Sequence, residues 1–391
     1  MMERVDVAIV GGGVIGSAIA FNLLSMDPGL SVLVVERDPT YRMASSALSA
    51  SSIRQQFSTP LNIAMSVYGM AFMKDIAAHL SVDGEAPELD IVERGYLYLA
   101  TETGLPILEA NHQTQRQQGV DVAFLTPTAL GQRFPWLATG DLAAGSLGLS
   151  GEGWFDGYSL LQAFRRKARS LGAVYRTGEA VAFEADHGRV TAIVLDDGTR
   201  IACGKLVNAA GPQAGEVAKR LGIALPVVPE KHCVFVFDCK ESLADCPLVI
   251  DPSGLYFRPE GNRYIAGPPP RDPSEAGHAN LDVEYDLFDD VVWPTLAARV
   301  PAFEAIKMAS AWAGYYEMNT FDQNAILGTA PGIENCYFAN GFSGHGMQQS
   351  PAVGRGIAEL ILYGEYRALD LRLFDFGRLL TRSPVRELNI I

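Results

Sequence analysis

A glycine-rich stretch near the N-terminus constrains the fold of this chain more than any other feature. Residues 5–10 are an apolar run typical of a buried parallel strand, and Gly11-Gly-Gly-Val-Ile-Gly16 follows directly. A helix is predicted over residues 14–25, so the G-x-G-x-x-G spacing lies between a strand and a helix. That arrangement is typical of a βαβ unit that binds a dinucleotide.

Each glycine of this motif has a physical role. Gly11 permits a tight turn, Gly13 lets the backbone approach a pyrophosphate, and Gly16 lets the helix pack closely on the strand. Free N–H groups at the helix start, together with the positive end of the helix dipole, favour phosphate binding. The predicted cofactor contacts therefore include Val14 and Ile15.

An acidic residue follows at the expected distance. Glu36 ends a second strand predicted over residues 31–35 and lies 20 residues after Gly16. Its carboxylate can accept both ribose hydroxyls and would repel a 2′-phosphate, which argues against NADP. Arg37 is predicted to contact the cofactor beside it. The motif alone leaves FAD and NAD open.

Composition excludes several classes of protein. Hydrophobic residues make up 48% and charged residues 19% of the 391 residues, which is enough for a large core. The net charge of −14 disfavours nucleic acid as a partner. No stretch approaches the roughly 18 apolar residues of a transmembrane helix, and the N-terminal run does not resemble a signal peptide. The five cysteines form no C-x-x-C pair, so we expect reduced thiols, no metal site and a cytoplasmic location.

The order of predicted elements indicates two domains. Strands and helices alternate near both ends, whereas residues 226–322 alternate like strands and are rich in aromatics and prolines. In the middle, strands are predicted over residues 96–100, 174–177, 180–184, 190–195, 200–202 and 206–210, and helices over 158–171 and 351–363. We predict an α/β and α+β protein: a Rossmann-like FAD-binding domain of the GR2 type (residues 1–90, 150–225 and 325–391), with an inserted mixed-sheet substrate domain (residues 91–149 and 226–324).

Two later features favour FAD over NAD. Leu206-Val-Asn-Ala-Ala-Gly211 predicts a strand aimed at the same nucleotide after a β-meander. Asn340-Gly-Phe-Ser-Gly-His-Gly-Met-Gln-Gln349 is a second Gly-rich loop that opens another helix. Since reduced flavin carries negative charge near N1 and the C2 carbonyl, a helix N-terminus there would stabilise it.

Together these residues resemble the D-amino-acid-oxidase-like FAD-dependent oxidoreductase superfamily, in its sarcosine oxidase and dimethylglycine dehydrogenase branch. The resemblance covers nearly the whole chain. It is strongest at Ser51-Ser-Ile-Arg-Gln-Gln-Phe57, Tyr256-Phe-Arg-Pro259, Trp312-Ala-Gly-Tyr-Tyr-Glu-Met-Asn-Thr-Phe-Asp322, the Gly341–Gln349 loop and the C-terminal Asn389-Ile-Ile. These segments look like those of a bacterial relative of the mitochondrial FAD-dependent oxidoreductase domain-containing proteins, which are linked to respiratory complex I assembly.

The resemblance implies further site residues. A family arginine that grips the substrate carboxylate matches Arg54, and a guanidinium suits that role because it binds carboxylates bidentately. Inserted-domain residues implied to face flavin and substrate are Tyr256, Arg258 and Tyr316, with Glu317 near a substrate ammonium and His232 at the flavin edge. Cofactor contacts are implied at Ser45, Ser46, Ala50, Ser51, Val181, Ala209, Gly211, Gly314, Ser343, Gly344, His345, Gly346, Met347 and Gln348; His345 and Gln348 are also placed at the catalytic centre.

Three departures from the family pattern modify this expectation. Gly314-Tyr315-Tyr316 lacks the cysteine that sarcosine oxidase bonds to flavin, and no histidine lies near the N-terminal loop, so we predict non-covalent FAD. Gln348 stands where the family has a second carboxylate-binding lysine, which predicts weaker binding or a different substrate. The oxygen-activating lysine aligns near Tyr264-Ile265, and its absence favours a dehydrogenase over an oxidase.

We therefore expect oxidation of the C–N bond of a secondary or N-substituted amino acid to an imine, by hydride transfer to flavin N5. His345 and the helix dipole are expected to stabilise the anionic reduced flavin. The expected electron acceptor is an electron-transfer protein or a quinone. Two alternatives stay open: an FAD-dependent 2-hydroxy acid dehydrogenase, and a redox-silent FAD-containing assembly or binding protein.

Overall fold

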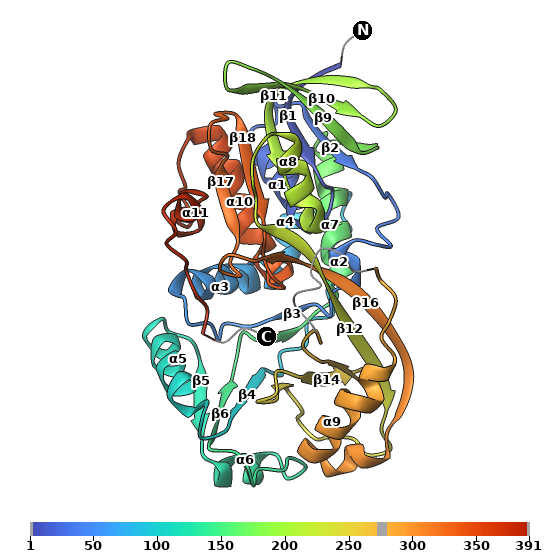
Figure 1. Ribbon diagram of the computed structural model, residues 1–391, viewed down its shortest axis with the longest axis vertical. Coiled ribbons are helices and arrows are strands. Elements are labelled where there is room, and N and C mark those ends of the chain that lie inside the picture. The colour runs from blue at the N-terminus through green and yellow to red at the C-terminus, as the bar shows by residue number, and fades with distance from the viewer. Residues whose placement is uncertain (1–2, 272–279, 389–391) are drawn as a thin grey trace.

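The computed structural model describes residues 3–271 and 280–388; the quoted C-terminal residues 389–391 lie outside the described part. The chain builds two eight-stranded sheets, one above the other along the long axis of the molecule (Figure 1). A small two-stranded sheet, β3 (Ser52–Ile53) with β7 (Gly153–Trp154), lies between them. The fold class predicted from the sequence is confirmed.

The first sheet has a parallel centre. Its strand order is β17-β18-β11-β1-β2-β8, and the antiparallel strands β9 and β10 branch from β11. β1 pairs in parallel with both β2 and β11, so the loops that follow these three strands meet at one edge of the sheet. The strands are β1 (Glu3–Val10), β2 (Val32–Glu36), β8 (Val174–Thr177), β9 (Ala180–Asp186), β10 (Arg189–Leu195), β11 (Arg200–Asn208), β17 (Ile326–Thr329) and β18 (Cys336–Asn340).

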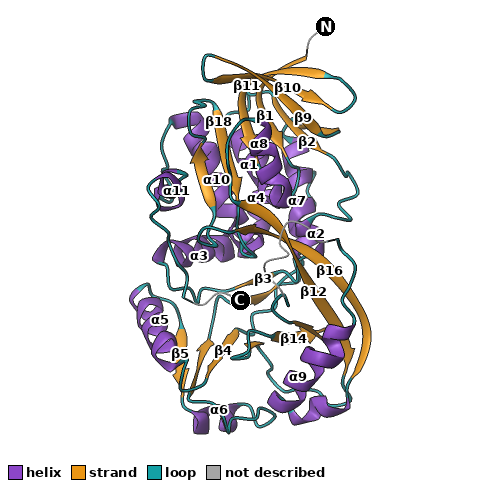
Figure 2. Ribbon diagram, viewed as in Figure 1, coloured by secondary structure: helices purple, strands orange, loops and turns teal. Residues whose placement is uncertain are grey.

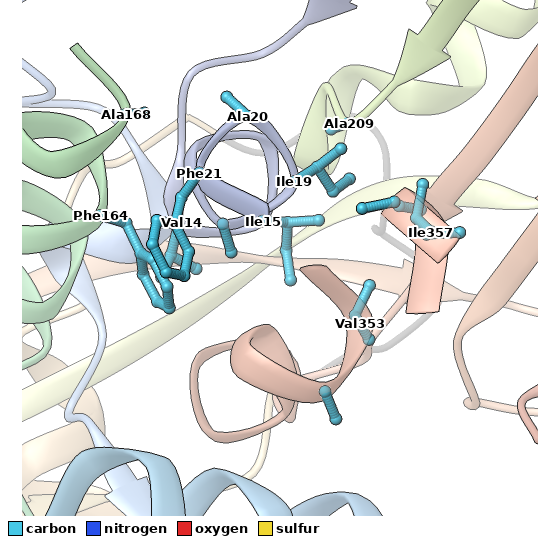
Figure 3. Packing of buried hydrophobic residues seen from close by; sticks show 14 of the residues in the cluster. Val14, Ile15, Ile19, Ala20, Phe21, Phe164, Ala168, Ala209, Val353 and Ile357 are labelled. Atoms are coloured by element: carbon cyan, nitrogen blue, oxygen red, sulfur yellow. The ribbon is translucent and has the colours of Figure 1, made fainter. Parts of the chain in front are cut away.

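Helices pack against this sheet through a shared apolar core (Figure 2). α1 (Val14–Met26) lies between α7 (Gly157–Ser170) and α10 (Gly346–Tyr363): Phe21 meets Phe164 on one side, and Val353 and Ile357 approach on the other (Figure 3). The remaining helices of this half are α2 (Ser45–Leu48), α3 (Pro60–Lys74), α4 (Ile76–Leu80), α8 (Ala214–Arg220) and α11 (Gly377–Leu380).

The second sheet has the order β16-β12-β15-β14-β13-β4-β6-β5 and a separate core rich in phenylalanine. Its strands are β4 (Tyr96–Ala100), β5 (Val122–Leu125), β6 (Ala144–Gly148), β12 (Val227–Asp238), β13 (Leu248–Ile250), β14 (Tyr256–Glu260), β15 (Arg263–Gly267) and β16 (Lys307–Asn319). Helices α5 (Leu105–Gln117), α6 (Pro127–Arg133) and α9 (Trp293–Arg299) belong to this half (Figure 1). The exact domain boundaries stay a prediction.

Strands β12 and β16 join the two halves. They pair antiparallel without a break from Val227↔Asn319 to Asp238↔Lys307, with one register shift between Val236 and Phe237. In Figure 1 this long ribbon runs from the first sheet into the second. It therefore carries residues of both halves past the region between the sheets.

The structure differs from the sequence prediction at β11 and at α10. Residues 200–202 and 206–210 are not two strands, because β11 continues unbroken from Arg200 to Asn208. Helix α10 begins at Gly346, before the predicted start at Pro351, and so contains this proline. Pro351 has no N–H to donate to the carbonyl of Met347. The Ser350 hydroxyl donates to that carbonyl instead, at 2.9 Å.

Candidate active site

A large pocket opens where the loops after β1, β2 and β11 meet the ribbon of β12 and β16. Its empty volume is about 1370 Å³, which includes the space open to solvent. Most of the predicted cofactor residues line it: Gly11, Gly13, Val14, Ile15, Glu36, Arg37, Ser45, Ser46, Ala50, Ala209, Gly211, Gly314, Gly344, Gly346 and Met347. The structure thus brings segments from the whole length of the chain to one wall.

The glycine motif has the geometry that its spacing predicts. Gly11 has φ +102°, and a Cβ there would lie 2.2 Å from the carbonyl oxygen of Ala209 on the neighbouring strand. A Cβ on Gly16 would lie 1.9 Å from the carbonyl oxygen of Gly11, so only glycine lets α1 start this close to the loop. A Cβ on Gly13 would meet only the Ser46 hydroxyl, at 3.3 Å, and this position faces the pocket.

These groups fit a dinucleotide diphosphate. No side chain caps the N-terminus of α1, and its first turn contains no acidic residue. Within residues 3–271 and 280–388 the buried hydroxyl of Ser45 has no hydrogen-bond partner, and the hydroxyl of Ser46 accepts from the backbone N–H of Val14 at 3.1 Å. Unused donors around a glycine cradle at a helix N-terminus are what a phosphate requires.

Glu36 lies on the same wall, at the end of β2. Its carboxylate accepts from the backbone N–H of Gly12 at 2.8 Å and from that of Asp38 at 2.9 Å. These bonds fix the carboxylate at the edge of the pocket. Each carboxylate oxygen retains a second lone pair for a ribose hydroxyl.

A small pocket adjoins the large one. It has an empty volume of about 600 Å³ and shares Ser49, Ala50, Tyr256, Tyr316, Gly344 and Met347 with the large pocket. Five of the six predicted catalytic residues line it, namely Arg54, Tyr256, Tyr316, His345 and Gln348. Leu248 and Ile250 of β13 supply an apolar wall.

Arg54 is the main charged group of the small pocket, and only 3% of the residue is exposed. Its Nη1 donates to the hydroxyl of Tyr98, its Nη2 lies 2.8 Å from Nε2 of His345, and its guanidinium lies 4.5 Å above the ring of Phe57. Burial lowers the pKa of Arg54 below its ordinary value. Even so, an arginine keeps its charge.

His345 is consequently neutral. Burial, and next to it the charge of Arg54, hold the pKa of His345 well below its usual range. Because a guanidinium can only donate, Nε2 of His345 is the acceptor and its proton is on Nδ1. The positive charge in this corner is therefore that of Arg54, and the expected role of His345 beside reduced flavin stays a prediction, with its Nδ1–H as the group that can donate.

Gln348 supports Arg54 from the start of α10. Its side-chain carbonyl accepts from the backbone N–H of Arg54 at 2.8 Å and from the hydroxyl of Ser66 at 3.4 Å. This use of the carbonyl leaves the amide N–H₂ as the group that Gln348 can offer in the pocket. Gln348, at the position where the resemblance implies a lysine, thus holds the backbone of the arginine.

Arg258 does not line either pocket, contrary to its predicted place at the catalytic centre. It is buried, its Nη1 pairs with Glu260, and its Nη2 donates to the carbonyl of Ala50 at 2.8 Å. The indole of Trp312 similarly donates to the carbonyl of Leu48 at 2.8 Å. Both side chains therefore fix the backbone of residues 48–50, which line the large pocket.

Other predicted positions also lie away from the pocket walls. Val181 is 39% exposed on β9 and lines neither pocket, although its neighbour Ala180 borders an adjoining pocket with Glu36. Ser343 is buried, and its hydroxyl accepts from the N–H of Asn319 at 3.0 Å, which fixes the Gly-rich loop. Ile265, aligned near the oxygen-activating lysine, is buried away from both pockets.

Several ionisable side chains of the second sheet border the pockets. Burial raises the pKa of Tyr256 and of Tyr316, so both hydroxyls are protonated near neutral pH. Burial also raises the pKa of Glu317 to about 8, against one hydrogen bond from the backbone N–H of Gly341. His232 borders the large pocket, stacks on Tyr316 with ring centroids 3.8 Å apart, and lies 2.9 Å from Glu230.

Sequence reasoning missed several residues that surround Arg54. Tyr98 belongs to β4, which the sequence predicted as a strand without a function. Glu152 is fully buried and accepts from the backbone N–H groups of Gln55 and Gln56 at 2.6 and 3.0 Å, which shapes the loop that carries Arg54. Burial raises the pKa of Glu152 to about 7. No local motif marks this carboxylate, because its partners lie 56 to 97 residues away.

Comparison with known proteins now defines the class. The pattern of the family described as "FAD dependent oxidoreductase" (DAO) matches residues 6–360. The chain belongs to this family and binds FAD, and the resemblance inferred from its motifs is confirmed.

Individual relatives agree. FAD-dependent oxidoreductase domain-containing protein 1 of Xenopus laevis is 44% identical, over 100% of this chain and 85% of that protein. Glycine oxidase of Geobacillus kaustophilus is 31% identical, over 97% of this chain and 98% of that enzyme. The crystal structure of L-proline dehydrogenase from P. horikoshii superimposes with a TM-score of 0.86 at 25% identity, covering 99% of this chain and 100% of that one.

None of the helices in residues 3–271 and 280–388 is both long enough and apolar enough to cross a membrane.

Proposed function

We propose that this protein oxidises the C–N bond of a secondary or N-substituted amino acid to an imine. The observation that carries the proposal is the buried guanidinium of Arg54 in a small pocket that shares a wall with the FAD pocket. The names of the relatives, glycine oxidase and L-proline dehydrogenase, also favour an amino acid.

The residues of the small pocket support distinct parts of this reaction. Arg54 binds the substrate carboxylate, and Leu248 and Ile250 accept an apolar substituent. His345, neutral and hydrogen-bonded to Arg54, orients the guanidinium. Since Tyr256 and Tyr316 stay protonated, they can donate to the substrate but cannot take its proton, so the amine reacts in its unprotonated form.

FAD supplies the two-electron acceptor of the reaction. The chain contributes two helix N-termini on one wall, those of α1 and α10, which favour negative charge at the diphosphate and at the flavin respectively. Among the described residues no lysine lines either pocket, which favours a dehydrogenase that passes electrons to a protein or quinone over an oxidase.

The test is anaerobic mixing of the holoenzyme with sarcosine, other N-alkyl amino acids, opines, L-proline and glycine. Bleaching of the visible flavin absorbance by a secondary amino acid is the expected result. Reoxidation by oxygen, compared with reoxidation by a dye or an electron-transfer flavoprotein, then separates oxidase from dehydrogenase. If 2-hydroxy acids bleach the flavin and no amine does, the alternative 2-hydroxy acid activity replaces this proposal.

Arg54→Met gives a sharper test of the carboxylate site. Leaving a carboxylate unpaired costs about 1.5–4 kcal/mol, so KM should rise by a factor on the order of 10–1000. Arg54→Lys, which keeps the charge without the planar fork, is the matched control and should give a smaller rise. An unchanged KM in Arg54→Met would refute the assigned role.

A redox-silent FAD protein with an assembly or binding role is a different class of function. It predicts that no substrate bleaches the flavin and that a stable partner is recovered with the protein. The small pocket weighs against it, because a purely structural FAD site does not require an adjoining pocket lined by a buried arginine.

A further inference from the structure

The C-terminal end of the described chain lies against the segment that carries Arg54. Residues 385–388, here termed the C-terminal strap, include Glu387, which is only 4% exposed. The Glu387 carboxylate accepts from the N–H and hydroxyl of Ser58, both at 2.7 Å, from the N–H of Thr59 at 2.9 Å and from the amide of Asn62 at 2.9 Å. It therefore caps the start of α3, where Thr59 makes no side-chain cap of its own.

The strap is anchored at its other end as well. The N–H of Val385 donates to Asp322 at 3.0 Å, and its carbonyl accepts from the amide of Asn324 at 2.8 Å. Asp322 in turn receives two hydrogen bonds from Arg378, at 2.7 and 3.0 Å. Because these partners are buried, the strap is built into the protein and does not lie loosely on its surface.

A chain of buried amides connects the strap to the small pocket. Asn62, which donates to Glu387, accepts from the side-chain amide of Gln349 at 3.0 Å. The preceding residue on α10, Gln348, accepts from the backbone N–H of Arg54 at 2.8 Å. A change at Glu387 thus reaches both the loop of Arg54 and the helix that supports it.

Charge gives an independent link. Burial lowers the pKa of Arg54, whereas Tyr96, Glu387 and Glu152 oppose that effect through their negative charge in the ionised form. A buried guanidinium requires negative charge in its surroundings, and Glu387 of the C-terminal strap supplies part of it.

We propose that Glu387 is a positioning residue of the substrate site, which fixes Arg54 for carboxylate binding through the C-terminal strap. This inference rests on the proposed role of Arg54. It implies that residues 385–388 influence substrate affinity and leave FAD binding unaffected, since Glu387 lines neither pocket.

The experiment uses the full-length holoenzyme and a probe that cannot be oxidised at a C–N bond. Propanoate is titrated while the visible flavin absorbance is followed, and propanamide serves as its uncharged counterpart. Glu387→Gln should weaken propanoate binding by about ten- to a hundred-fold, as for a lost charge-assisted hydrogen bond, with little change for propanamide. Arg386→Gln, at an exposed neighbour on the same strap, is the matched control and should behave as wild type.

The double variant Arg54→Met/Glu387→Gln should bind propanoate no more weakly than Arg54→Met alone, because the two residues act as a unit. If Arg54→Met loses propanoate and Glu387→Gln matches Arg386→Gln, this inference is overturned while the proposed function stands. If the wild type does not bind propanoate, or Arg54→Met binds it normally, the role of Arg54 fails and this inference fails with it. Equal weakening of propanoate and propanamide would indicate general distortion and also overturns the inference.

Should Glu387→Gln fail to retain FAD, Ser58→Ala provides a milder perturbation. It removes one hydrogen bond to Glu387 and the acceptor for the N–H of Leu388. The expected result is a rise of roughly two- to ten-fold in the propanoate Kd with FAD retained. No rise would contradict the positioning role.

Discussion

Glu317 offers a direct test of the electrostatics of the pocket. Its carboxyl borders the large pocket at the start of α10, and among the described residues its hydrogen bond comes from the N–H of Gly341, at 3.1 Å. Glutamine has nearly the same shape as a protonated glutamic acid, and its carbonyl can accept the same hydrogen bond. Glu317→Gln therefore removes the titration and little else.

The magnitude follows from the pKa of Glu317, which burial raises from an ordinary 4.5 to about 8. The pKa of Glu317 is higher in the folded than in the unfolded state, so its contribution to the free energy of unfolding is fully present below about pH 4.5. That contribution is lost as the pH rises through about 8. Such a shift corresponds to at most about 5 kcal/mol, and screening by water in the open pocket reduces it to a few kcal/mol.

The assay is urea unfolding of wild type and Glu317→Gln at pH 5 and pH 9, with FAD at saturating concentration. Near pH 5 the two proteins should have similar free energies of unfolding, and at pH 9 the variant should be more stable by a few kcal/mol. Glu365→Gln, at an exposed carboxylate, controls for the change of net charge. A difference between wild type and Glu317→Gln that is the same at both pH values would refute the reasoning.

Two further substitutions test the FAD pocket. Gly16→Ala places a methyl group 1.9 Å from a backbone carbonyl, so the purified protein should lack the visible absorbance of bound FAD; a full FAD complement would contradict the tight-turn argument. Arg258→Met removes the donor to the Ala50 carbonyl and should raise the FAD Kd on the order of ten-fold by fluorescence titration, with substrate KM changed less; a KM effect larger than the Kd effect would restore Arg258 to the substrate site.

The nucleotide-binding half was largely predictable from local patterns. The strand before Gly11, the helix after it and Glu36 depend on neighbours in sequence, since a glycine that needs positive φ and an apolar run of fixed length are local requirements. Family membership could also be read from motifs. The extent of α10 could not, because Ser350 compensates for Pro351 through a contact that no propensity reports.

Arg258 shows where strand patterns stop being informative. It shares the face of Tyr256 on β14, as alternation along a strand requires, yet only Tyr256 reaches the pockets. Alternation gives the face of a side chain and not how far along the strand a pocket extends. Val181 of β9 is a second example: it lines neither the large nor the small pocket, although the preceding residue, Ala180, borders the adjoining pocket.

The carboxylates around Arg54 were beyond sequence reasoning for a different reason. Glu152 and Glu387 meet the Arg54 segment across 96 and more than 320 residues, respectively. Such contacts are set by the order of strands and the path of the C-terminus, for instance the parallel pairing of β13 with β4. Without that topology, a buried glutamate cannot be told from a surface one.

The ribbon formed by β12 and β16 has a consequence for how small molecules enter. Because the β12–β16 ribbon of the second sheet begins in the apolar core of the first, where Val227 packs, swinging one sheet away from the other would require bending this ribbon. Large hinge opening is therefore disfavoured in this architecture. We expect entry and exit to depend instead on the loops that line the large pocket, such as the one that carries the exposed Met43.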